Sequence, residues 1–345
     1  MRLRRSDCSA PGLGRRRAGR GFVYLDASGA PVHDPDVIAR ARALVIPPAW
    51  KHVWICPWPN GHIQAVGTDA RGRRQYLYHP AWREARDRAK FDHMLDVAAA
   101  LPSIRSRCRA DLGGEGLTRE RVLAGAVRLL DTGFFRVGGE EYLEENGSFG
   151  LATILKSQTR VRGDEVVFDY PAKSGRHRVQ SVVDPSVRDL VNALKRRRGG
   201  GPELLAYRGG ARWVDVRSQD INDYLQAISP VHVSAKDFRT WHATVLAAVS
   251  LALAGRDAAT TTARARAVAN AMREVSTYLG NTPTVCRKSY VDPRVVDRFR
   301  EGITVIGTLE RLPAATGVGQ SHDREAVEAA VLAMLVDEGT DAAAA

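Results

Sequence analysis

The sequence predicts an α+β protein with a small β-rich N-terminal domain and a larger, mainly α-helical domain that contains a three-stranded β-meander. Short runs of β-branched and aromatic residues, separated by turn residues, fill positions 21–80. From about residue 118 onward, apolar residues recur at helical spacing. Residues 160–183 interrupt that pattern with three strand-like runs and two turns. These three observations define the two domains.

The clearest strand signal in the N-terminal domain is a hairpin centred on Asn60-Gly61, a dipeptide that suits tight β-turns. The turn joins the runs Val53–Cys56 and His62–Val66. A further strand is expected at Gln75–Tyr78, and a short helix is expected over residues 35–44. Residues 21–80 are therefore interpreted as one small β-rich unit.

The first 20 residues are dominated by positive charge. They hold seven arginines and almost no apolar periodicity, so we expect residues 1–20 to form a disordered basic arm. Immediately after them, Phe22–Leu25 and Pro31-Val32 flank the turn residues 26–29, which predicts a first hairpin.

A charged amphipathic helix over residues 81–100 is expected to link the two domains. The helical domain is assigned to residues 101–338, with a frayed low-complexity tail at 339–345. Its first helix has Thr118 as a plausible N-cap and Gly133 just past its end. Further helices are expected over residues 186–196, 219–227, 238–254, 258–279 and 321–337.

The composition favours a globular protein with a polyanionic partner. The 345 residues are 44% hydrophobic and 26% charged, which is ordinary for a protein that buries a core. Lys and Arg outnumber Asp and Glu by 51 to 39, and the resulting charge of +12 favours binding to nucleic acid phosphates. No stretch approaches the roughly 18 apolar residues of a membrane span, so we expect no membrane association.

The cysteines and the N-terminus indicate a cytoplasmic protein. Cys8, Cys56, Cys108 and Cys286 lie far apart and form no C-x-x-C pair, so neither a disulfide framework nor a structural zinc site is expected. The N-terminus lacks the apolar core of a signal peptide. We therefore expect free thiols in a reducing compartment.

Tyr290 has the most unusual setting of the nine tyrosines. Arg287 and Lys288 directly precede it, and nearby positive charge favours the phenolate form of a tyrosine. It also follows a helix that ends at Gly280-Asn281, with Pro283 beyond. The alternative interpretation is an aromatic ring half-buried beside a helix.

Three cations occupy positions that suit an anionic ligand. Arg239 opens a strongly apolar helix, where a cation opposes the helix dipole but would reinforce the binding of a phosphate. Arg136 lies between two aromatic residues and two glycines, which would let the backbone come close to a ligand. Lys173 lies at the tip of a predicted β-turn. Each of these side chains alone is equally compatible with a solvated charge.

Five side chains occur in the order of the catalytic pentad of type IB DNA topoisomerases: Arg136, Lys173, Arg239, Asn281 and Tyr290. The chain resembles the small bacterial and poxvirus members of that family over about residues 22–300. Five sequence blocks in order carry the rest of the resemblance: Ile46-Pro47-Pro48-Ala49-Trp50, Gly72-Arg73-Arg74-Gln75-Tyr76, Gly147-Ser148-Phe149-Gly150-Leu151, Lys236-Asp237-Phe238-Arg239-Thr240-Trp241 and Gly280-Asn281-Thr282-Pro283.

The resemblance implies a covalent mechanism. Tyr290 would attack a DNA phosphodiester, form a 3′-phosphotyrosyl link and free a 5′-hydroxyl, so that neither ATP nor a metal ion is required. Both positive and negative supercoils would be relaxed. Arg136 and Arg239 would hold the non-bridging phosphate oxygens. Asn281 would donate one more hydrogen bond, and Lys173 would protonate the leaving 5′-oxygen.

One member of the pentad departs from part of the family. Poxvirus and nuclear members carry a histidine where this chain has Asn281, whereas the bacterial branch carries asparagine. An asparagine keeps an N–H donor but cannot transfer a proton, which favours a hydrogen-bonding role at that position. Lys236 matches a lysine near the site in the family and is expected to be auxiliary.

The resemblance also implies how DNA is held. In the family, the N-terminal β domain and the catalytic domain form a clamp around duplex DNA, and in poxvirus members a Gln-Tyr-x-Tyr block reaches bases. The residues expected to contact DNA are Arg73, Arg74, Gln75, Tyr76 and Tyr78. The alternative is that they are strand residues with solvent-facing polar groups. The expected enzyme is a monomer associated with the nucleoid, with double-stranded DNA as its partner.

The nearest alternative is a tyrosine recombinase or integrase, which shares much of the Arg–Lys–Arg–Tyr chemistry. Recombinases typically carry His-x-x-Arg where this chain has Lys236-Asp237-Phe238-Arg239, and their N-terminal domain is usually helical. A non-catalytic DNA-binding protein is an alternative from another class, against which the full set of five residues argues. A metal-dependent nuclease is disfavoured because the sequence lacks a metal-ligand cluster.

Overall fold

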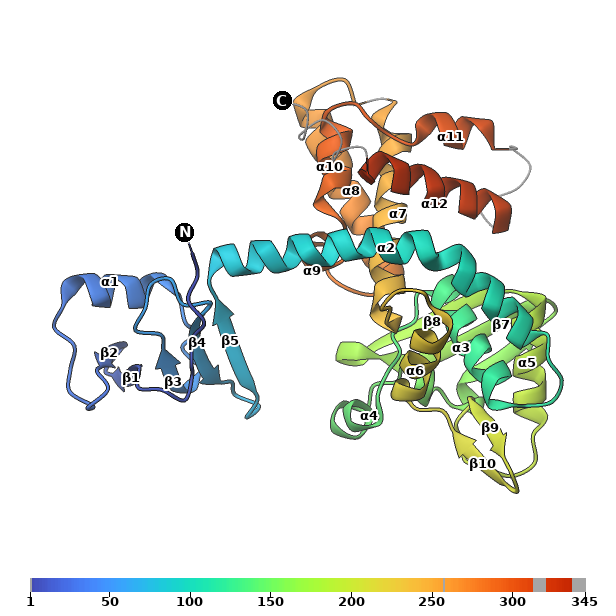
Figure 1. Cartoon of the computed structure of the whole chain (residues 1–345), viewed down its shortest axis with the longest axis horizontal. Coiled ribbons are helices and arrows are strands. Elements are labelled where there is room, and N and C mark those ends of the chain that lie inside the picture. Colours follow the sequence, from blue (N-terminus) through green and yellow to red (C-terminus); the bar gives the residue numbers. More distant parts are fainter. Residues whose placement is uncertain (1, 257, 313–320, 337–345) are drawn as a thin grey trace. The chain divides into compact units, whose positions relative to one another are not determined.

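The structure is a computed structural model that describes residues 2–256, 258–312 and 321–336. It divides into two compact units, Met1–Asp92 and His93–Ala345, which Figure 1 colours along the chain. The division falls within helix α2 (Pro80–Leu112). The expected linker helix over 81–100 therefore exists but continues twelve residues further, to Leu112. The tail at 339–345 lies outside the described residues.

The first unit is built on a five-stranded antiparallel sheet in the order β2-β1-β3-β4-β5. The predicted hairpin around Asn60-Gly61 is confirmed as the pairing of β3 with β4. The small core of the unit lies between the sheet and helix α1 and includes Ile55, Ala65 and Ala41. The elements are β1 (Leu13–Ala18), β2 (Gly21–Leu25), α1 (Pro35–Ala43), β3 (Lys51–Ile55), β4 (Ile63–Thr68) and β5 (Arg74–Tyr78).

The prediction of a disordered arm over residues 1–20 was wrong. Strand β1 lies inside the sheet, paired with β2 on one side and β3 on the other. Its Arg15 stacks over Phe22 and donates hydrogen bonds to the carbonyls of Ile46 and Pro47, both at 2.8 Å. The prediction of disorder rested on the number of arginines alone. An arginine-rich strand can fold when its backbone pairs with neighbouring strands and its side chains find carbonyl acceptors. The predicted first hairpin forms in a short version, with a bridge between Leu25 and Pro31 and backbone bonds from Val32 to Tyr24 and from Asp26 to Ala30.

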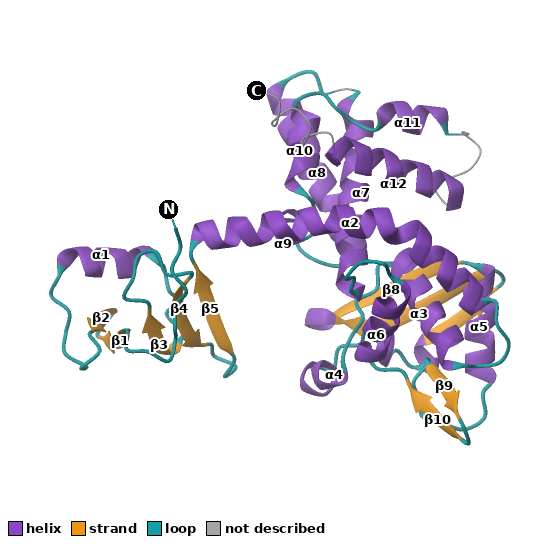
Figure 2. Ribbon diagram, in the orientation of Figure 1, coloured by secondary structure: helices purple, strands orange, loops and turns teal. Residues whose placement is uncertain are grey.

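The second unit contains the end of α2, then helix α3 and the three-stranded meander, both of which the sequence predicted (Figure 2). Thr118 is the N-cap of α3, and its side chain accepts a hydrogen bond from the backbone of Arg121. The meander pairs in the order β6-β7-β8 and contacts α3 and α5. These elements are α3 (Arg119–Gly133), α4 (Glu140–Asn146), β6 (Thr159–Arg162), β7 (Glu165–Ala172), β8 (Arg176–Val183) and α5 (Pro185–Arg196), with short 3-10 turns at Leu151–Thr153, Lys156–Gln158 and Lys173–Gly175.

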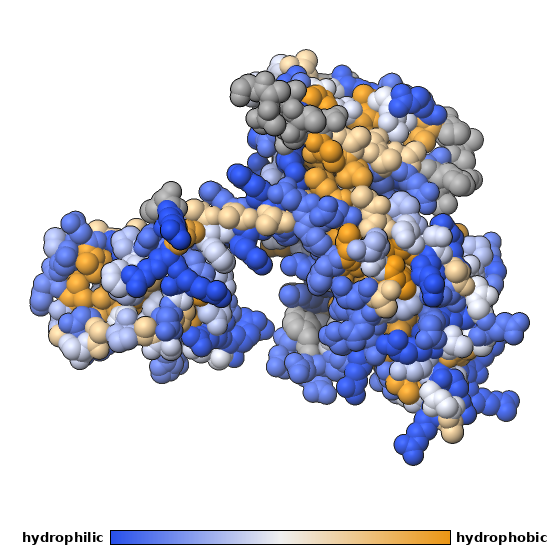
Figure 3. All heavy atoms as spheres, viewed as in Figure 1, coloured by the Kyte–Doolittle hydropathy of each residue, from blue (hydrophilic) through white to orange (hydrophobic). Residues whose placement is uncertain are grey.

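The remaining helices pack around α7, which contacts α3, α6, α8, α10, α11 and α12. In Figure 3 most of the visible surface is hydrophilic, and hydrophobic residues show mainly over this group of helices. The sequence did not predict the β9–β10 hairpin or helices α4, α9, α10 and α11, which are short. The elements are β9 (Ala206–Gly209), β10 (Arg212–Asp215), α6 (Ser218–Ile228), α7 (Ala235–Gly255), α8 (Thr261–Leu279), α9 (Pro283–Ser289), α10 (Pro293–Arg300), α11 (Ile306–Arg311) and α12 (Ser321–Val336).

Candidate active site

The ends of several elements in the second unit meet at one pocket of about 370 Å³. Residues from four of the five predicted catalytic positions line it, together with the predicted auxiliary lysine: Arg136, Lys173, Arg239, Tyr290 and Lys236. The fifth, Asn281, lines a neighbouring pocket that shares Arg136 and Lys173. Side chains spread over more than 150 positions of sequence are thus gathered into one place.

Arg239 is the most deeply buried charge of the site, at 3% exposure. It donates to the carbonyl oxygens of Phe134, at 2.5 Å, and Leu279, at 2.9 Å. Its Nε is buried and has no partner among the described residues. Burial, and next the charge of Arg136, lower the pKa of Arg239 to about 10. This guanidinium is therefore held in place without a countercharge, and an anion in the pocket would stabilise it.

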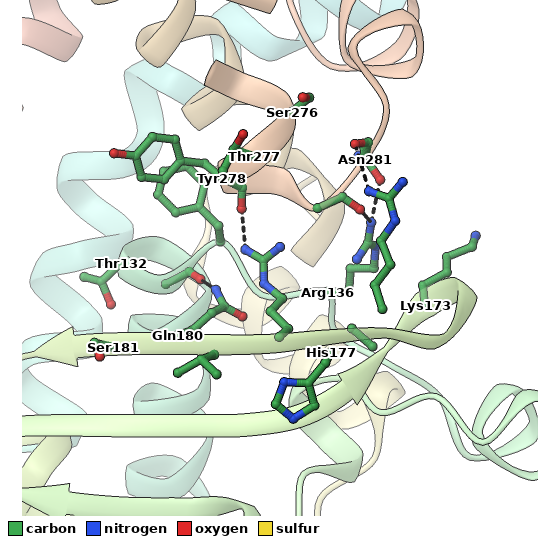
Figure 4. A pocket seen from close by; sticks show the side chains of 17 residues that line it. Thr132, Arg136, Lys173, His177, Gln180, Ser181, Ser276, Thr277, Tyr278 and Asn281 are labelled. Carbon is green, nitrogen blue, oxygen red and sulfur yellow. Dashed lines mark hydrogen bonds between the residues drawn. The ribbon is translucent and has the colours of Figure 1, made fainter. Parts of the chain in front are cut away.

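Arg136 and Asn281 form the second anchor of the site. The Nη2 of Arg136 donates to Asn281 Oδ1 at 2.5 Å and to the carbonyl of Gly280 at 2.9 Å. Figure 4 shows these contacts, with Lys173 on the neighbouring β-turn. Because the amide oxygen of Asn281 faces Arg136, its Nδ2 is left buried without a partner among the described residues. Both Nδ2 of Asn281 and Nε of Arg239 are thus buried N–H donors available to a ligand.

Asn281 is positioned by the end of helix α8. Gly280 is the C-cap and has a left-handed backbone, with φ of 62°. The N–H of Asn281 then bonds to the carbonyl of Ser276 at 3.1 Å, which closes the helix end. A Cβ at Gly280 would lie 2.4 Å from Nη1 of Arg178. The left-handed backbone favours glycine at this position, and a larger residue would also make the Arg178 guanidinium shift.

Two glycines tie the Arg136 segment to the turn that carries Lys173. Gly138 and Gly150 pack backbone against backbone, and a Cβ on Gly150 would lie 2.4 Å from Cα of Gly138. The N–H of Leu151 bonds to the carbonyl of Arg136 at 2.8 Å. The N–H of Phe149 bonds to the carbonyl of Pro171 at 2.8 Å, two residues before Lys173. Gly138 thus allows a close approach to Gly150, and together with Gly139 it also lines the Tyr290 pocket, so the expected approach of this backbone to a ligand stays a prediction.

Tyr290 is half-buried at the C-terminal end of helix α9, where it is the C-cap residue. Its backbone N–H bonds to the carbonyl of Cys286 at 3.0 Å. The hydroxyl of Thr244, which is fully buried on α7, accepts from the N–H of Asp292 at 3.1 Å, and its one proton is shared between the carbonyls of Thr240 at 3.0 Å and Tyr290 at 3.3 Å. The ring of Tyr290 lies 5.4 Å from Cζ of Arg239. The tyrosine is thus fixed beside the buried guanidinium.

The five predicted DNA-contact residues of the first unit divide into two groups on strand β5 and its turn. Tyr76 and Tyr78, each 39% exposed, stack with ring centroids 6.1 Å apart, and Cζ of Arg74 lies 5.6 Å from the Tyr76 ring. By contrast, Gln75 and Arg73 are engaged with Asp69, at 2.9 and 2.8 Å. The side-chain bond from Arg73 lowers the pKa of Asp69 to about 2. Because side chains alternate along a strand, Arg74, Tyr76 and Tyr78 share one exposed face, whereas Arg73 and Gln75 on the other face bond to the Asp69 carboxylate.

Comparison with known proteins gives the same assignment in both units. The family model described as the catalytic core of eukaryotic DNA topoisomerase I matches residues 79–308, more than half of the chain. The model described as the N-terminal domain of bacterial DNA topoisomerase IB matches residues 21–69. The chain belongs to the type IB DNA topoisomerase family. It is therefore a DNA topoisomerase, an isomerase that acts on DNA, and the recombinase alternative is set aside.

The curated relatives of this topoisomerase are viral. DNA topoisomerase 1B of Acanthamoeba polyphaga mimivirus is 26% identical over 287 residues, which cover 81% of this chain and 85% of the relative. DNA topoisomerase I of Monkeypox virus and DNA topoisomerase 1B of Vaccinia virus (strain Western Reserve) are each 21% identical over 237 residues. Those alignments cover 68% of this chain and 72% of each relative.

Several residues that build the topoisomerase site were not identified from the sequence. Thr244 fixes the backbone of Tyr290, Phe134 provides the carbonyl that holds Arg239, and Arg178 abuts Gly280. Phe134 has a left-handed backbone with φ of 55°, which is rare for a residue with a bulky side chain. No local sequence pattern marks these roles, because each is defined by a contact with a distant segment.

The described residues were also compared with the requirements of a metal site and of a membrane-spanning helix. Among the described residues, no group of three His, Cys, Asp or Glu side chains is placed to hold a metal ion. Across the same part of the chain, no helix is both long and apolar enough to cross a membrane.

Proposed function

We propose that the enzyme relaxes supercoiled DNA by cutting and resealing one strand through a 3′-phosphotyrosyl intermediate at Tyr290, with no need for ATP or a metal ion. The observation that carries the proposal is the buried Arg239 beside the Tyr290 ring, held by backbone carbonyls and lacking a carboxylate partner in the described structure. Such a site suits a phosphate, since a phosphate supplies the missing negative charge.

The proposed reaction is an in-line displacement at phosphorus. The phenolic oxygen of Tyr290 attacks, its proton passes to solvent, and the bond from phosphorus to the 5′-oxygen breaks. The transition state carries added negative charge on the non-bridging oxygens, where Arg239, Arg136 and the free Nδ2 of Asn281 would donate hydrogen bonds. These donors are already oriented, so little reorganisation is required when the charge develops.

Lys173 is proposed as the general acid. It is exposed on the turn between β7 and β8 and lines the Tyr290 pocket, as does the exposed Lys236 of α7, which we propose as an auxiliary cation. An ammonium group can protonate the leaving 5′-oxygen and take the proton back when that hydroxyl attacks during resealing. The two half-reactions are therefore the reverse of each other, and the phosphodiester energy is conserved.

Double-stranded DNA is the proposed partner of a monomeric enzyme in the bacterial cytoplasm, associated with the nucleoid. The β-rich unit over residues 21–80 is proposed to bind DNA through Arg74, Tyr76 and Tyr78, and to close a clamp with the catalytic unit. The aromatic rings can stack on or bond to bases, and the guanidinium can bind phosphate. Gln75 and Arg73 remain predicted contacts, but each would first have to leave Asp69.

Relaxation of supercoiled plasmid in EDTA without ATP tests the proposal. The wild-type protein should relax both positive and negative supercoils. Replacing Tyr290 with Phe should abolish relaxation and leave salt-sensitive DNA binding intact, while the control Tyr207→Phe on strand β9 should relax DNA normally. Relaxation by the Tyr290 variant, or a requirement for ATP or a metal ion, would contradict the proposal.

A further inference from the structure

The site consists of two pockets that share the side chains of Arg136 and Lys173. Tyr290 and Arg239 line only the smaller pocket. The larger pocket, of about 760 Å³, extends from the shared residues along strand β8 and the end of helix α8. Figure 4 shows this larger pocket, with Asn281 and Lys173 at one end and Thr132 and Ser181 toward the other. Its volume falls in the range typical of ligand sites.

The lining of the larger pocket is cationic. Strand β8 contributes Arg176 and Arg178, which add to the shared Arg136 and Lys173, and also His177, whose ring bonds to Asp169 at 2.8 Å. None of the described residues that line it is an aspartate or glutamate. Its other walls combine polar and small side chains with Phe134, Val179 and Tyr278, and its four cationic side chains favour a negatively charged ligand.

The two new arginines are held in the same way as the proposed catalytic ones. Arg176 donates from Nη1 to the carbonyl of Asn281 at 3.3 Å, and Arg178 donates from Nη2 to the carbonyl of Tyr278. Burial lowers the pKa of Arg178, and the nearby Tyr170 opposes that shift while Arg136 adds to it. Each guanidinium keeps further N–H donors beyond the one that the carbonyl takes. Both therefore bond to the Tyr278–Asn281 segment that lines the pocket, and the carbonyls of that segment supply no countercharge.

The geometry of an in-line displacement assigns a role to the larger pocket. The attacking and leaving oxygens must lie on opposite sides of the phosphorus atom. The attacking oxygen belongs to Tyr290, which lines only the smaller pocket. The leaving 5′-oxygen must then lie on the side away from Tyr290, where Lys173 lines both pockets.

We infer that the larger pocket holds the strand on the 5′-hydroxyl side of the break, with Arg176 and Arg178 binding its first phosphates. The inference rests on the proposed function. During swivelling this strand leaves the pocket, and resealing requires its return. Arg176 and Arg178 therefore set how readily the free 5′-end is recaptured, while Arg136 and Arg239 act on the phosphorus that Tyr290 attacks.

The test separates cutting from resealing. A substrate whose short 5′-hydroxyl strand is lost after cleavage traps the covalent adduct, and a short DNA strand with a 5′-hydroxyl is then added at increasing concentration. We expect Arg176→Ala to slow resealing, through weaker acceptor binding, about 10-fold more than it slows cleavage. Arg178→Lys, which keeps the charge but loses the planar fork, should show the same bias to a smaller degree. Arg162→Ala is the control, because Arg162 is an exposed arginine of the same sheet that does not line the pocket.

A second acceptor strand tests whether the arginines bind its phosphates. In this strand the first internucleotide phosphates are replaced by uncharged methylphosphonates. The wild type should reseal it more poorly than Arg176→Ala reseals the natural strand, because Arg178 also loses its phosphate contact, and the variant should distinguish the two acceptors less than the wild type does. Equal losses in cutting and resealing, or a variant that still prefers the charged acceptor as strongly as the wild type, would overturn the inference alone. Failure of the wild type to form any adduct would overturn the proposed function and this inference with it.

Discussion

Two clusters of arginines lie on either side of Phe134 and are built in opposite ways. In the first, Arg105 and Arg324 each bond to both Asp131 and Glu328, with contacts between 2.6 and 3.0 Å. The cluster joins helices α2, α3 and α12, and the ring of His242 connects it to the ring of Phe134 at 5.4 Å. In the second, Arg239 and Arg136 bond to backbone carbonyls and one amide, Arg239 also interacts with the Tyr290 hydroxyl, and neither has a carboxylate partner among the described residues.

The type of partner distinguishes arginines that stabilise the fold from arginines that are free to bind a ligand. Guanidiniums paired with buried carboxylates are neutralised, and the pair holds helices together. Guanidiniums fixed by carbonyls keep their charge, because a carbonyl supplies orientation but no net negative charge. The protein bears the cost of that uncompensated charge at the site where DNA phosphate is proposed to bind.

The largest effect on stability is expected from Asp131→Asn. Asp131 is 2% exposed, and its loss of charge leaves the buried Arg105 and the partly buried Arg324 with one carboxylate between them. We expect the free energy of unfolding to fall by about 3–5 kcal/mol, measured by denaturant titration. The control Asp164→Asn removes a carboxylate that is 72% exposed, and its unfolding midpoint should match the wild type. A loss below about 1 kcal/mol at Asp131 would show that the first cluster is not structural.

Arg239→Ala is expected to impair catalysis strongly and to change stability little. The rate of covalent adduct formation should fall about 100-fold or more, because one preorganised donor to the transition state is lost. The free energy of unfolding should change little, since the substitution also removes a buried charge that has no carboxylate partner. Single-turnover cleavage and denaturant unfolding of the same preparation measure both quantities. A stability loss as large as that of Asp131→Asn would erase the distinction between the clusters.

The first cluster should also make stability depend on pH. Burial, and next Arg324, lower the pKa of His242 below 6.5. Burial favours the neutral forms of Asp131 and Glu328, but the surrounding arginines outweigh it and hold their pKa values below 3.8 and 4.5. The unfolded chain therefore takes up protons at higher pH than the folded one, so stability is full above about pH 6.5 and declines as the pH falls.

Two variants test which residue causes the loss of stability in each pH interval. His242→Gln should flatten the curve of unfolding free energy between pH 7 and about 5, and Glu328→Gln should flatten the part below about 4.5. Wild-type and His242→Gln curves that run parallel over the first interval would contradict the role of the histidine.

The smallest effect is expected in the first unit. Arg74→Ala should weaken DNA binding across all sequences and reduce the slope of log binding constant against log salt by about one, as expected for one lost phosphate contact. Arg73→Ala should change the slope less, because Arg73 already pairs with Asp69 at 2.8 Å. Titrations at several salt concentrations measure both, and equal slopes for Arg74→Ala and the wild type would remove Arg74 from the interface.

Regular periodicity and turn residues predicted the parts of the fold that depend on local sequence. The β3–β4 hairpin, the meander, the Thr118 cap and the Gly280 helix end were all predicted from residues close together in the chain. Strand β1 was missed because its stability comes from pairing on both edges and from carbonyls that accept from Arg15. Short helices such as α9 were missed because a seven-residue segment has too little periodicity.

In the site, too, features carried by the order of residues along the chain were predicted, and features that depend on distant contacts were not. Order and spacing along the chain were sufficient to nominate the pentad through a family resemblance. Nothing in the sequence distinguishes Arg239, which meets carbonyls, from Arg105, which meets carboxylates, since the partners of both come from distant helices. The roles of Thr244 and Gly150 were likewise invisible, because each is defined by one contact across the fold.

Mapping the covalent adduct tests the central claim most directly. The protein is incubated in EDTA with the substrate that traps cleavage, digested with protease, and the DNA-linked peptide is identified by mass spectrometry. The account predicts a single adduct, with the 3′-phosphate esterified to Tyr290, and a reduction of about 100-fold or more in its rate of formation in Arg239→Ala. An adduct on another residue, or an undiminished rate in the Arg239 variant, would contradict it.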